Sequence, residues 1–178
     1  MWAVGKHNSI YWHVLVVSLV VALLFSGCNN EGDRKFRFHE LDFTYGAGMG
    51  GFYSLKINSA GDFVLGKGRP PDKIYFGRLK HEEKFRLDSI YNATPFEKLD
   101  TVYSNSIADL DSHSICIVSM GNMKCFTVLG GNKEPEKLRL LSEYLVYLIY
   151  HVKATPKDTI VTFKSLENVL KIPPPPND

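Results

Sequence analysis

Residues 52–65, FYSLKINSAGDFVL, contain two short apolar runs on either side of a turn-forming cluster. Aromatic and branched side chains dominate residues 52–57 and 63–65, as is typical of strands. The NSAGD segment at 58–62 is typical of a tight turn. The stretch therefore predicts a β-hairpin, and it favours an antiparallel sheet over a parallel βαβ design.

More strands are predicted on both sides of this hairpin. Apolar residues alternate over 36–45, which predicts a first strand, and residues 73–79 (KIYFGRL) predict a fourth. Residues 114–120 and 123–129 have the pattern of a second hairpin. A further short strand is expected near Tyr103.

Two helices are predicted, one before and one after the second hairpin. Residues 80–92 are polar, with apolar residues at helical spacing, and this helix should end before Pro95. Asn132 offers an N-cap for the second helix, and Pro135 suits its first turn. The apolar stripe of that helix comprises Leu138, Leu141, Leu145 and Leu148. The sequence thus predicts an α+β fold, an antiparallel sheet of about six strands with two helices on one face, in the order ββββ-α-ββ-α.

The N-terminal segment has the pattern of a leader. Lys6 precedes an apolar run at 14–25 (VLVVSLVVALLF), and Ser26 and Gly27 are the small residues that a peptidase needs. Cys28 follows directly, and this arrangement resembles the lipobox of bacterial lipoproteins. The resemblance implies cleavage before Cys28 and acylation of that cysteine, palmitate included, which anchors the protein in the lipid bilayer. The alternative is an uncleaved membrane anchor, and either arrangement leaves the remaining chain outside the cytoplasm.

Four segments follow from this leader. They are a signal peptide at 1–27, a lipidated tether at 28–37, an α+β domain at 38–151 and an irregular extension with a Pro-rich tail at 152–178. Within the extension, a strand is expected over 159–163 and a helical turn over 166–170. Asn29 follows the cysteine in place of the Asp that marks inner-membrane retention in enteric bacteria. The predicted location is therefore the cell envelope, at the outer membrane.

The charge balance argues against several classes of partner. The chain has 21 Lys and Arg residues and 19 Asp and Glu residues, and loss of Lys6 with the leader would leave 20 basic residues. The lack of a basic excess argues against nucleic acid, and the lack of an acidic excess argues against a cation-binding surface. The partners that remain are the bilayer, through acylated Cys28, and an envelope protein or glycan.

Four short motifs are spread over residues 43–151. They are Y-S-L-K-I at 53–57, Gly61 in the first turn, Tyr103 followed by Ala108-Asp109-Leu110, and Met120-Gly121 in the second turn. Together they are similar to those of a bacterial domain family of unknown function, common in secreted proteins and lipoproteins, whose members carry C-F-G-x-C-P before the Y-S-L motif. Gly46 and Gly50 occupy the positions of both family cysteines. Because the function of the family is unknown, the resemblance gives no activity to expect here; it implies that the loop-closing disulfide is absent and that the loop is more mobile.

Cys116 and Cys125 flank the second predicted hairpin. A Met120-Gly121 turn would place them directly opposite one another, whereas a Gly121-Asn122 turn would place them diagonally. Directly opposite cysteines can form a disulfide, and diagonal ones mostly cannot. Both registers remain open, and the sequence favours two buried thiols over a disulfide.

Residues 46–51, GAGMGG, formally match the G-x-G-x-x-G pattern. A dinucleotide site requires a helix directly after this loop, because the helix N-terminus binds the pyrophosphate. A strand is predicted here instead, so we expect no cofactor and interpret the loop as a connection between strands. Its residues Gly46, Gly48, Met49, Gly50 and Gly51 also form the candidate binding loop.

Residues for catalysis or metal binding are scattered along the sequence. His39, His81, His113 and His151 show no zinc-site spacing, so no metal is expected. Asp111-Ser112-His113 contains the residue types of a hydrolase triad, but neighbours in sequence rarely form one. The pattern favours a solvated turn.

The favoured function is a non-catalytic binding or scaffolding module of the envelope. One alternative is an envelope hydrolase acting on glycan or peptide, for which Asp109, Glu82 or Glu83 and a histidine would have to converge. The other is an inhibitor-like protein whose 46–51 loop enters an enzyme.

Overall fold

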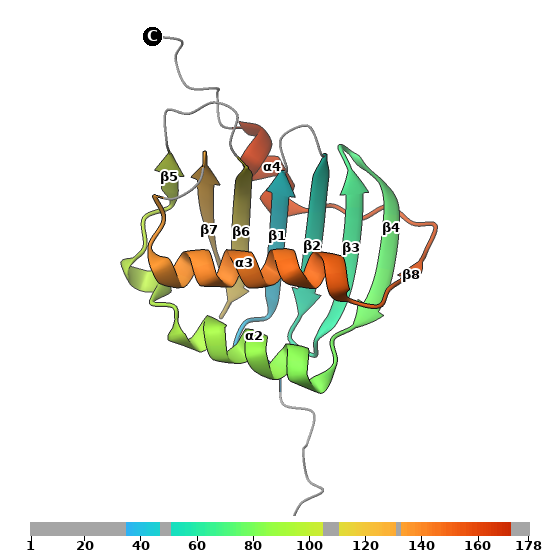
Figure 1. Cartoon of the computed structure of the whole chain (residues 1–178), viewed down its shortest axis with the longest axis horizontal. Coiled ribbons are helices and arrows are strands. Elements are labelled where there is room, and N and C mark those ends of the chain that lie inside the picture. Colours follow the sequence, from blue (N-terminus) through green and yellow to red (C-terminus); the bar gives the residue numbers. More distant parts are fainter. Residues whose placement is uncertain (1–34, 47–50, 105–110, 131–132, 172–178) are drawn as a thin grey trace, which may run out of the picture. The chain divides into compact units, whose positions relative to one another are not determined.

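Eight strands form one sheet in the computed structural model, which describes residues 35–46, 51–104, 111–130 and 133–171 (Figure 1). The strands are β1 (Glu40–Gly46), β2 (Phe52–Asn58), β3 (Asp62–Gly68), β4 (Pro71–Arg78), β5 (Val102–Ser104), β6 (Ser112–Ser119), β7 (Asn122–Leu129) and β8 (Thr155–Pro156). Their order across the sheet is β5-β7-β6-β1-β2-β3-β4-β8. Neighbours are antiparallel except β5 and β7, which are parallel, so the sheet is mixed.

Strand β1 joins the two predicted hairpins, because it lies between β2 and β6. Alternation along β1 sends Leu41, Phe43 and Tyr45 to one face of the sheet and Asp42 and Thr44 to the other. The two faces therefore have different chemistry, apolar on one side and polar on the other.

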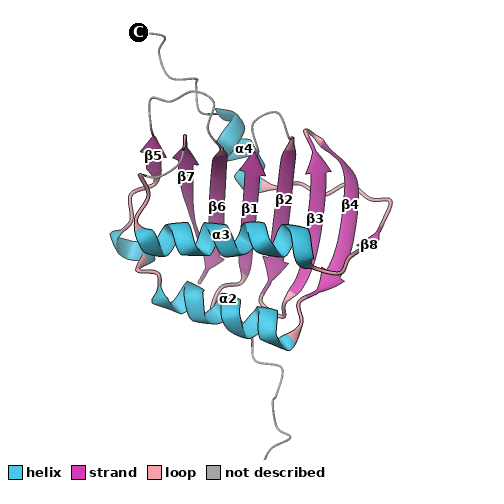
Figure 2. Cartoon of the chain, viewed as in Figure 1, coloured by secondary structure: helices cyan, strands magenta, loops and turns pink. Residues whose placement is uncertain are grey.

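Two helices cover the apolar face and a third lies on the opposite face (Figure 2). Helices α2 (His81–Ala93) and α3 (Glu136–His151) pack side by side on the first face, and a short 3-10 helix (Phe96–Lys98) follows α2. Helix α4 (Lys164–Lys171) contacts β1, β6 and β7.

The main core lies between the sheet and helices α2 and α3. From the sheet it takes fully buried side chains such as Phe43, Leu55 and Ile115. From α3 it takes the predicted stripe, Leu138, Leu141, Leu145 and Leu148, each with no exposed surface. Burial of each such side chain contributes about 1.5–3 kcal/mol, so this interface accounts for most of the hydrophobic stabilisation.

The α4 face has a smaller apolar cluster of Ile74, Phe163 and Leu166. Gly66 makes room for it, because a Cβ atom at this position would approach the Phe163 ring to 2.8 Å. The absence of a side chain in the middle of β3 thus allows an aromatic ring to pack directly on the sheet.

Buried polar groups attach α4 to β1. The Ser165 hydroxyl and the Lys164 backbone N–H both donate to the Asp42 carboxylate, the latter over 2.7 Å. Lys56 Nζ lies 3.6 Å from the same carboxylate. Asp42 is only 2 % exposed, and burial raises its pKa, although these partners oppose that rise.

A chain of hydroxyl groups continues from Asp42 across the sheet. Thr44 Oγ1 lies 2.7 Å from Ser165 Oγ and 2.8 Å from Ser54 Oγ. Because Ser165 gives its single proton to Asp42, Thr44 donates to Ser165 and Ser54 donates to Thr44. We call Asp42, Thr44, Ser54 and Ser165 the α4 cluster.

The α+β class is confirmed, and the structure differs from the prediction in four respects. The sheet has eight strands instead of about six, and it is mixed instead of antiparallel, because β5 pairs parallel to β7. A third helix, α4, packs on the other face of the sheet against β1, β6 and β7. Residues 159–163 were expected to form a strand and form none; Ile160 is 98 % exposed, whereas Phe163 and Val161 pack in the cluster around Ile74. The pairing in this region is instead β8, and beyond it the Lys157 backbone N–H donates to Ile74 over 2.9 Å.

Smaller differences concern the ends of elements. The predicted helix at 80–92 is observed as α2 almost unchanged, and the expected helical turn at 166–170 is part of α4. Helix α3 begins after Pro135, which is its N-cap residue; the proposed cap Asn132 lies outside the described residues. Among the described helices, none is both long enough and apolar enough to span a membrane.

Candidate functional site

One row of side chains crosses the α3 face of the sheet in strict register. Val128 pairs with His113, His113 with Tyr45, Tyr45 with Tyr53, and Tyr53 with Lys67. Figure 1 shows α3 crossing the middle of the sheet, while the arrowhead end of β1, which carries Tyr45, extends beyond it. The row is thus placed along one flank of α3.

A cavity of about 300 Å³ lies between this row and α3. Its lining comprises Tyr45, Asp111 and His113 from the sheet side, with Glu134, Arg139, Ser142, Glu143 and Val146 from α3 and the residues before it. We call it the His113 pocket. It combines an imidazole, a buried hydroxyl and three carboxylates.

His113 lies at the base of this pocket and is 8 % exposed. Burial lowers the pKa of its imidazole to about 4, and the nearby carboxylates of Glu134 and Asp111 only partly oppose this. His113 is therefore neutral at pH 7. A neutral imidazole has one N–H donor and one acceptor nitrogen.

The partner of His113 is Ser142, whose Oγ lies 2.8 Å from Nε2. The same hydroxyl donates to the backbone carbonyl of Leu138 over 3.0 Å. A serine has a single hydroxyl proton, so a proton given to Leu138 cannot also be given to His113. Nε2 therefore carries the imidazole proton and donates it to Ser142, and Nδ1 is the acceptor nitrogen.

The carboxylates around the pocket differ in how well they are bonded. Tyr45 donates its hydroxyl to Asp111 over 2.6 Å, and Arg139 pairs with Glu143 at 3.1 Å. Glu134 Oε2 is buried and has no hydrogen-bond partner within the described parts of the chain. A buried oxygen without a donor is costly, so a donor brought to this atom would stabilise the protein. Because Oε2 has almost no accessible surface, the Glu134 side chain must turn toward the cavity to meet a ligand.

Aromatic side chains extend the sheet row away from the pocket. The rings of Tyr53 and Tyr150 lie 5.5 Å apart, and Tyr150 is 56 % exposed. Lys67 Nζ lies 5.9 Å from the Tyr53 ring centre and 5.2 Å from that of Tyr75. The sheet row therefore continues beyond the pocket through the Tyr53 ring and ends at Lys67.

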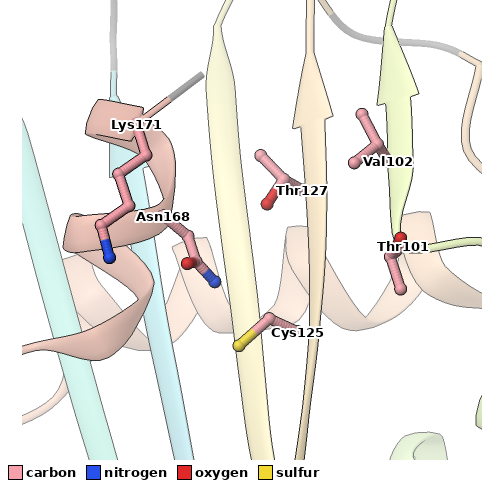
Figure 3. A pocket seen from close by; sticks show the side chains of 6 residues that line it. All are labelled: Thr101, Val102, Cys125, Thr127, Asn168 and Lys171. Carbon is pink, nitrogen blue, oxygen red and sulfur yellow. The ribbon is translucent and has the colours of Figure 1, made fainter.

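A second cavity, of about 270 Å³, lies on the α4 face (Figure 3). Figure 3 shows Asn168 and Lys171 on α4, facing Cys125 and Thr127 on β7, with Thr101 and Val102 beyond them. Asn168 Nδ2 donates to Cys116 Sγ over 3.3 Å. The lining includes no carboxylate and one charged residue, so it offers less chemistry than the His113 pocket.

Cys116 and Cys125 form a disulfide beside this cavity, with their Cα atoms 4.0 Å apart. The sequence favoured two free thiols, and the structure does not show them. The reason is the turn: Met120 and Gly121 both have positive φ, 50° and 78°, as a two-residue hairpin loop requires. That register places the two cysteines directly opposite one another.

The structure brings only part of the predicted site residues together. Cys28, Gly48, Met49, Gly50 and Asp109 lie outside the described residues. Gly46 ends β1 and Gly51 precedes β2, so they flank the loop that was considered for binding.

The other predicted residues divide between the pocket and the helices. Asp111 and His113 line the pocket, but Ser112, their neighbour in sequence, is not part of its lining. Glu82 and Glu83 lie in the first turn of α2, where Glu83 accepts a hydrogen bond from the backbone of Lys80 over 2.7 Å. Glu83 therefore caps the helix, and the charge of Glu82 in the first turn is favourable beside the helix N-terminus.

Sequence reasoning missed Ser142 and Glu134. Ser142 interrupts the apolar stripe of α3, and a buried serine in such a stripe is the signal that could have identified it. Glu134 precedes the helix and gives no comparable signal. No protein-family model and no curated protein matches this chain. Within the described residues, no three His, Cys, Asp or Glu side chains gather as a metal site would require.

Proposed function

We propose that the protein is a bacterial envelope lipoprotein that is anchored through acylated Cys28 and binds a ligand, without catalysis, in the His113 pocket. The leader sequence supports the anchor, and Asn29 supports the outer membrane. The Cys116–Cys125 disulfide supports a compartment outside the cytoplasm, where such bonds persist. The short motifs over residues 43–151 support membership of the lipoprotein-associated family that they resemble.

The observation that carries the binding function is Glu134 Oε2, a buried carboxylate oxygen without a donor beside a 300 Å³ cavity. Binding sites combine a concave surface with a small number of placed polar groups. Here Asp111, His113 and Glu143 add further polar groups to the same cavity. A ligand with hydroxyl or amino donors would satisfy them.

An envelope hydrolase is the second candidate, and the 2.8 Å contact between Ser142 Oγ and His113 Nε2 favours it. A nucleophilic serine must give its proton to the imidazole. Ser142 instead donates to the Leu138 carbonyl, and Ser142 is only 4 % exposed. The contact is therefore better explained as a hydrogen bond that stabilises the base of the pocket.

The anchor is tested by replacing Cys28. Wild-type protein and Cys28→Ser are expressed in a bacterial host with labelled palmitate, and membrane and soluble fractions are compared. The wild type should be labelled and membrane-bound, whereas the variant should lack the label. Labelling of the variant would contradict acylation at this residue.

Catalysis is tested with the full chain and Ser142→Ala on envelope glycans and peptides. We expect no turnover by either protein. Turnover that Ser142→Ala abolishes, in a variant that still folds, would favour the hydrolase over the binding protein.

A further inference from the structure

We propose that the His113 pocket continues along the tyrosine row as a groove, and that its ligand is a glycan chain without acidic sugars. This inference rests on the proposed binding function and names the class of ligand. The groove is defined by His113, Tyr45, Tyr53 and Lys67 on its floor and by the flank of α3 from Arg139 to Tyr150.

The floor is continuous because its four residues are direct neighbours on adjacent strands, β6, β1, β2 and β3. Three strand spacings separate His113 from Lys67, a length of about 14 Å. Such a floor is elongated, so it suits a chain of linked units better than a single compact molecule.

The wall of the groove is one flank of α3. Arg139, Ser142, Glu143 and Val146 all line the pocket, and Tyr150 is the next residue along the same flank, one turn beyond Val146. The Tyr150 ring contacts Tyr53 on the floor. Floor and wall are therefore close at two places, the His113 pocket and the Tyr53–Tyr150 pair.

Tyrosine rings with exposed edges and hydroxyl groups suit a sugar chain. A pyranose ring has an apolar face of C–H groups and a rim of hydroxyl groups. Tyr150, 56 % exposed, offers an amphipathic surface of this kind at low cost in conformational entropy. The carboxylates of Asp111, Glu134 and Glu143 can accept hydrogen bonds from sugar hydroxyl groups.

Charge determines which sugars fit. The pocket contains three carboxylates and a single guanidinium, that of Arg139, which pairs with Glu143. An acidic sugar would place another negative charge beside Asp111 and Glu134, whereas an uncharged or amino sugar would not. The groove therefore discriminates against acidic glycans.

A peptide ligand fits this groove less well. Strands β6, β1, β2 and β3 all have neighbours on both sides in the sheet. Their backbone groups are therefore paired within the sheet, and no free strand edge is available to an extended peptide. A peptide in this groove would contact side chains but could form no backbone hydrogen bonds with the sheet. A glycan binds through side-chain contacts alone, so it loses nothing by this.

The test uses the full chain in detergent on an array of neutral, amino and acidic glycans. The strongest uncharged oligosaccharide is then titrated by calorimetry into the wild type and into Tyr150→Ala. We expect neutral or amino glycans to bind and acidic ones of equal length to bind at least tenfold more weakly. Tyr150→Ala should weaken binding about tenfold, because it removes the exposed ring on which the apolar face of a sugar would pack.

Tyr147→Ala is the matched control. Tyr147 is on the same helix and is 44 % exposed, but its ring stacks on Tyr144 and His151, on the other flank of α3. Its removal should leave the affinity unchanged. Equal losses in both variants would contradict a groove along the Tyr150 flank.

A library of Lys- and Arg-containing peptides separates the two proposals. Binding of no neutral or amino glycan, or preference for acidic ones, would overturn the glycan inference. If peptides then bind in a manner that depends on Tyr150, the binding function stands with a different ligand. If neither class binds, both proposals fail.

Discussion

Strand β1 contributes to two polar clusters on opposite faces of the sheet, and the clusters differ in how completely they are bonded. Asp42 and Thr44 face the α4 cluster, where the carboxylate has donors from Ser165, Lys164 and Lys56. Tyr45 faces the His113 pocket, where Glu134 Oε2 has no donor in the described chain.

The difference supports a structural role for the α4 cluster and the ligand-binding role that we propose for the pocket. In the α4 cluster each hydroxyl proton is used, and two of the three partners of Asp42, Ser165 and Lys164, come from the segment that carries α4. The cluster therefore stabilises the attachment of that segment. In the pocket, the Glu134 carboxylate retains an acceptor oxygen without a donor, which lowers stability. A bound ligand that donates to it would restore that stability.

The largest effect is expected when the α4 cluster loses its carboxylate. Asp42→Ala removes the acceptor of the Ser165 hydroxyl and of the Lys164 backbone N–H, and it leaves buried donors without partners. We expect the free energy of unfolding, measured in urea, to fall by about 4 kcal/mol. Asp42→Asn retains an acceptor and should cost less.

Ligand binding provides the control for this prediction, because Asp42 lies on the face away from the pocket. Folded Asp42→Ala protein should retain the affinity of the wild type. A loss of affinity without a loss of stability would show that the division between the two faces is wrong.

The two clusters should also respond to pH with opposite signs. Below pH 6.5 the unfolded chain protonates its histidine, but folded His113 stays neutral until about pH 4. Stability is therefore lost as the pH falls through this range, by about 3 kcal/mol. Burial raises the pKa of the Asp42 carboxyl in the folded state. As the pH falls toward 3.8, the folded state therefore binds a proton at Asp42 before the unfolded state does, and Asp42 adds stability over that range.

The measurement is the free energy of unfolding in urea between pH 7 and 4. His113→Gln should remove most of the loss in this range, since the amide does not titrate. His39→Gln, at an exposed position, controls for the loss of a histidine as such. An unchanged pH profile in His113→Gln would show that the buried imidazole is not responsible.

The two faces were also unequally predictable from sequence. Hairpin patterns and the leucine stripe of α3 predicted the strands and helices of the main core, because burial of one face imposes a regular period. Helix α4 has eight residues, and only a helical turn was expected in its place. Its position depends on contacts between Asp42 and Ser165, which are 123 residues apart in sequence.

The pocket shows the same limit at the level of single residues. Asp111 and His113 were recognised as candidate chemistry, but their partner was sought at Ser112, the neighbour in sequence. The actual partner is Ser142 on α3, 29 residues from His113. The prediction of free thiols at Cys116 and Cys125 failed for another reason. Two turn registers were compatible with the sequence, and the observed register places the two cysteines opposite one another, where they form a disulfide.

The smallest effects come from a matched pair of buried serines, one in each cluster. Ser165→Ala removes a donor to the buried Asp42 carboxylate and should cost about 2 kcal/mol, because hydrogen bonds to charged groups are the stronger ones. Ser142→Ala removes the acceptor of the neutral His113 imidazole and should cost about 1 kcal/mol. Both values are measured by urea unfolding at pH 7.

The order of these two losses tests which cluster is the more tightly bonded. With Nε2 as the donor, Ser142→Ala leaves a buried N–H without an acceptor, and neither the wild type nor the variant should show turnover. A loss at Ser142 that exceeds the loss at Ser165 would show that the pocket, and not the α4 cluster, is the more tightly bonded of the two.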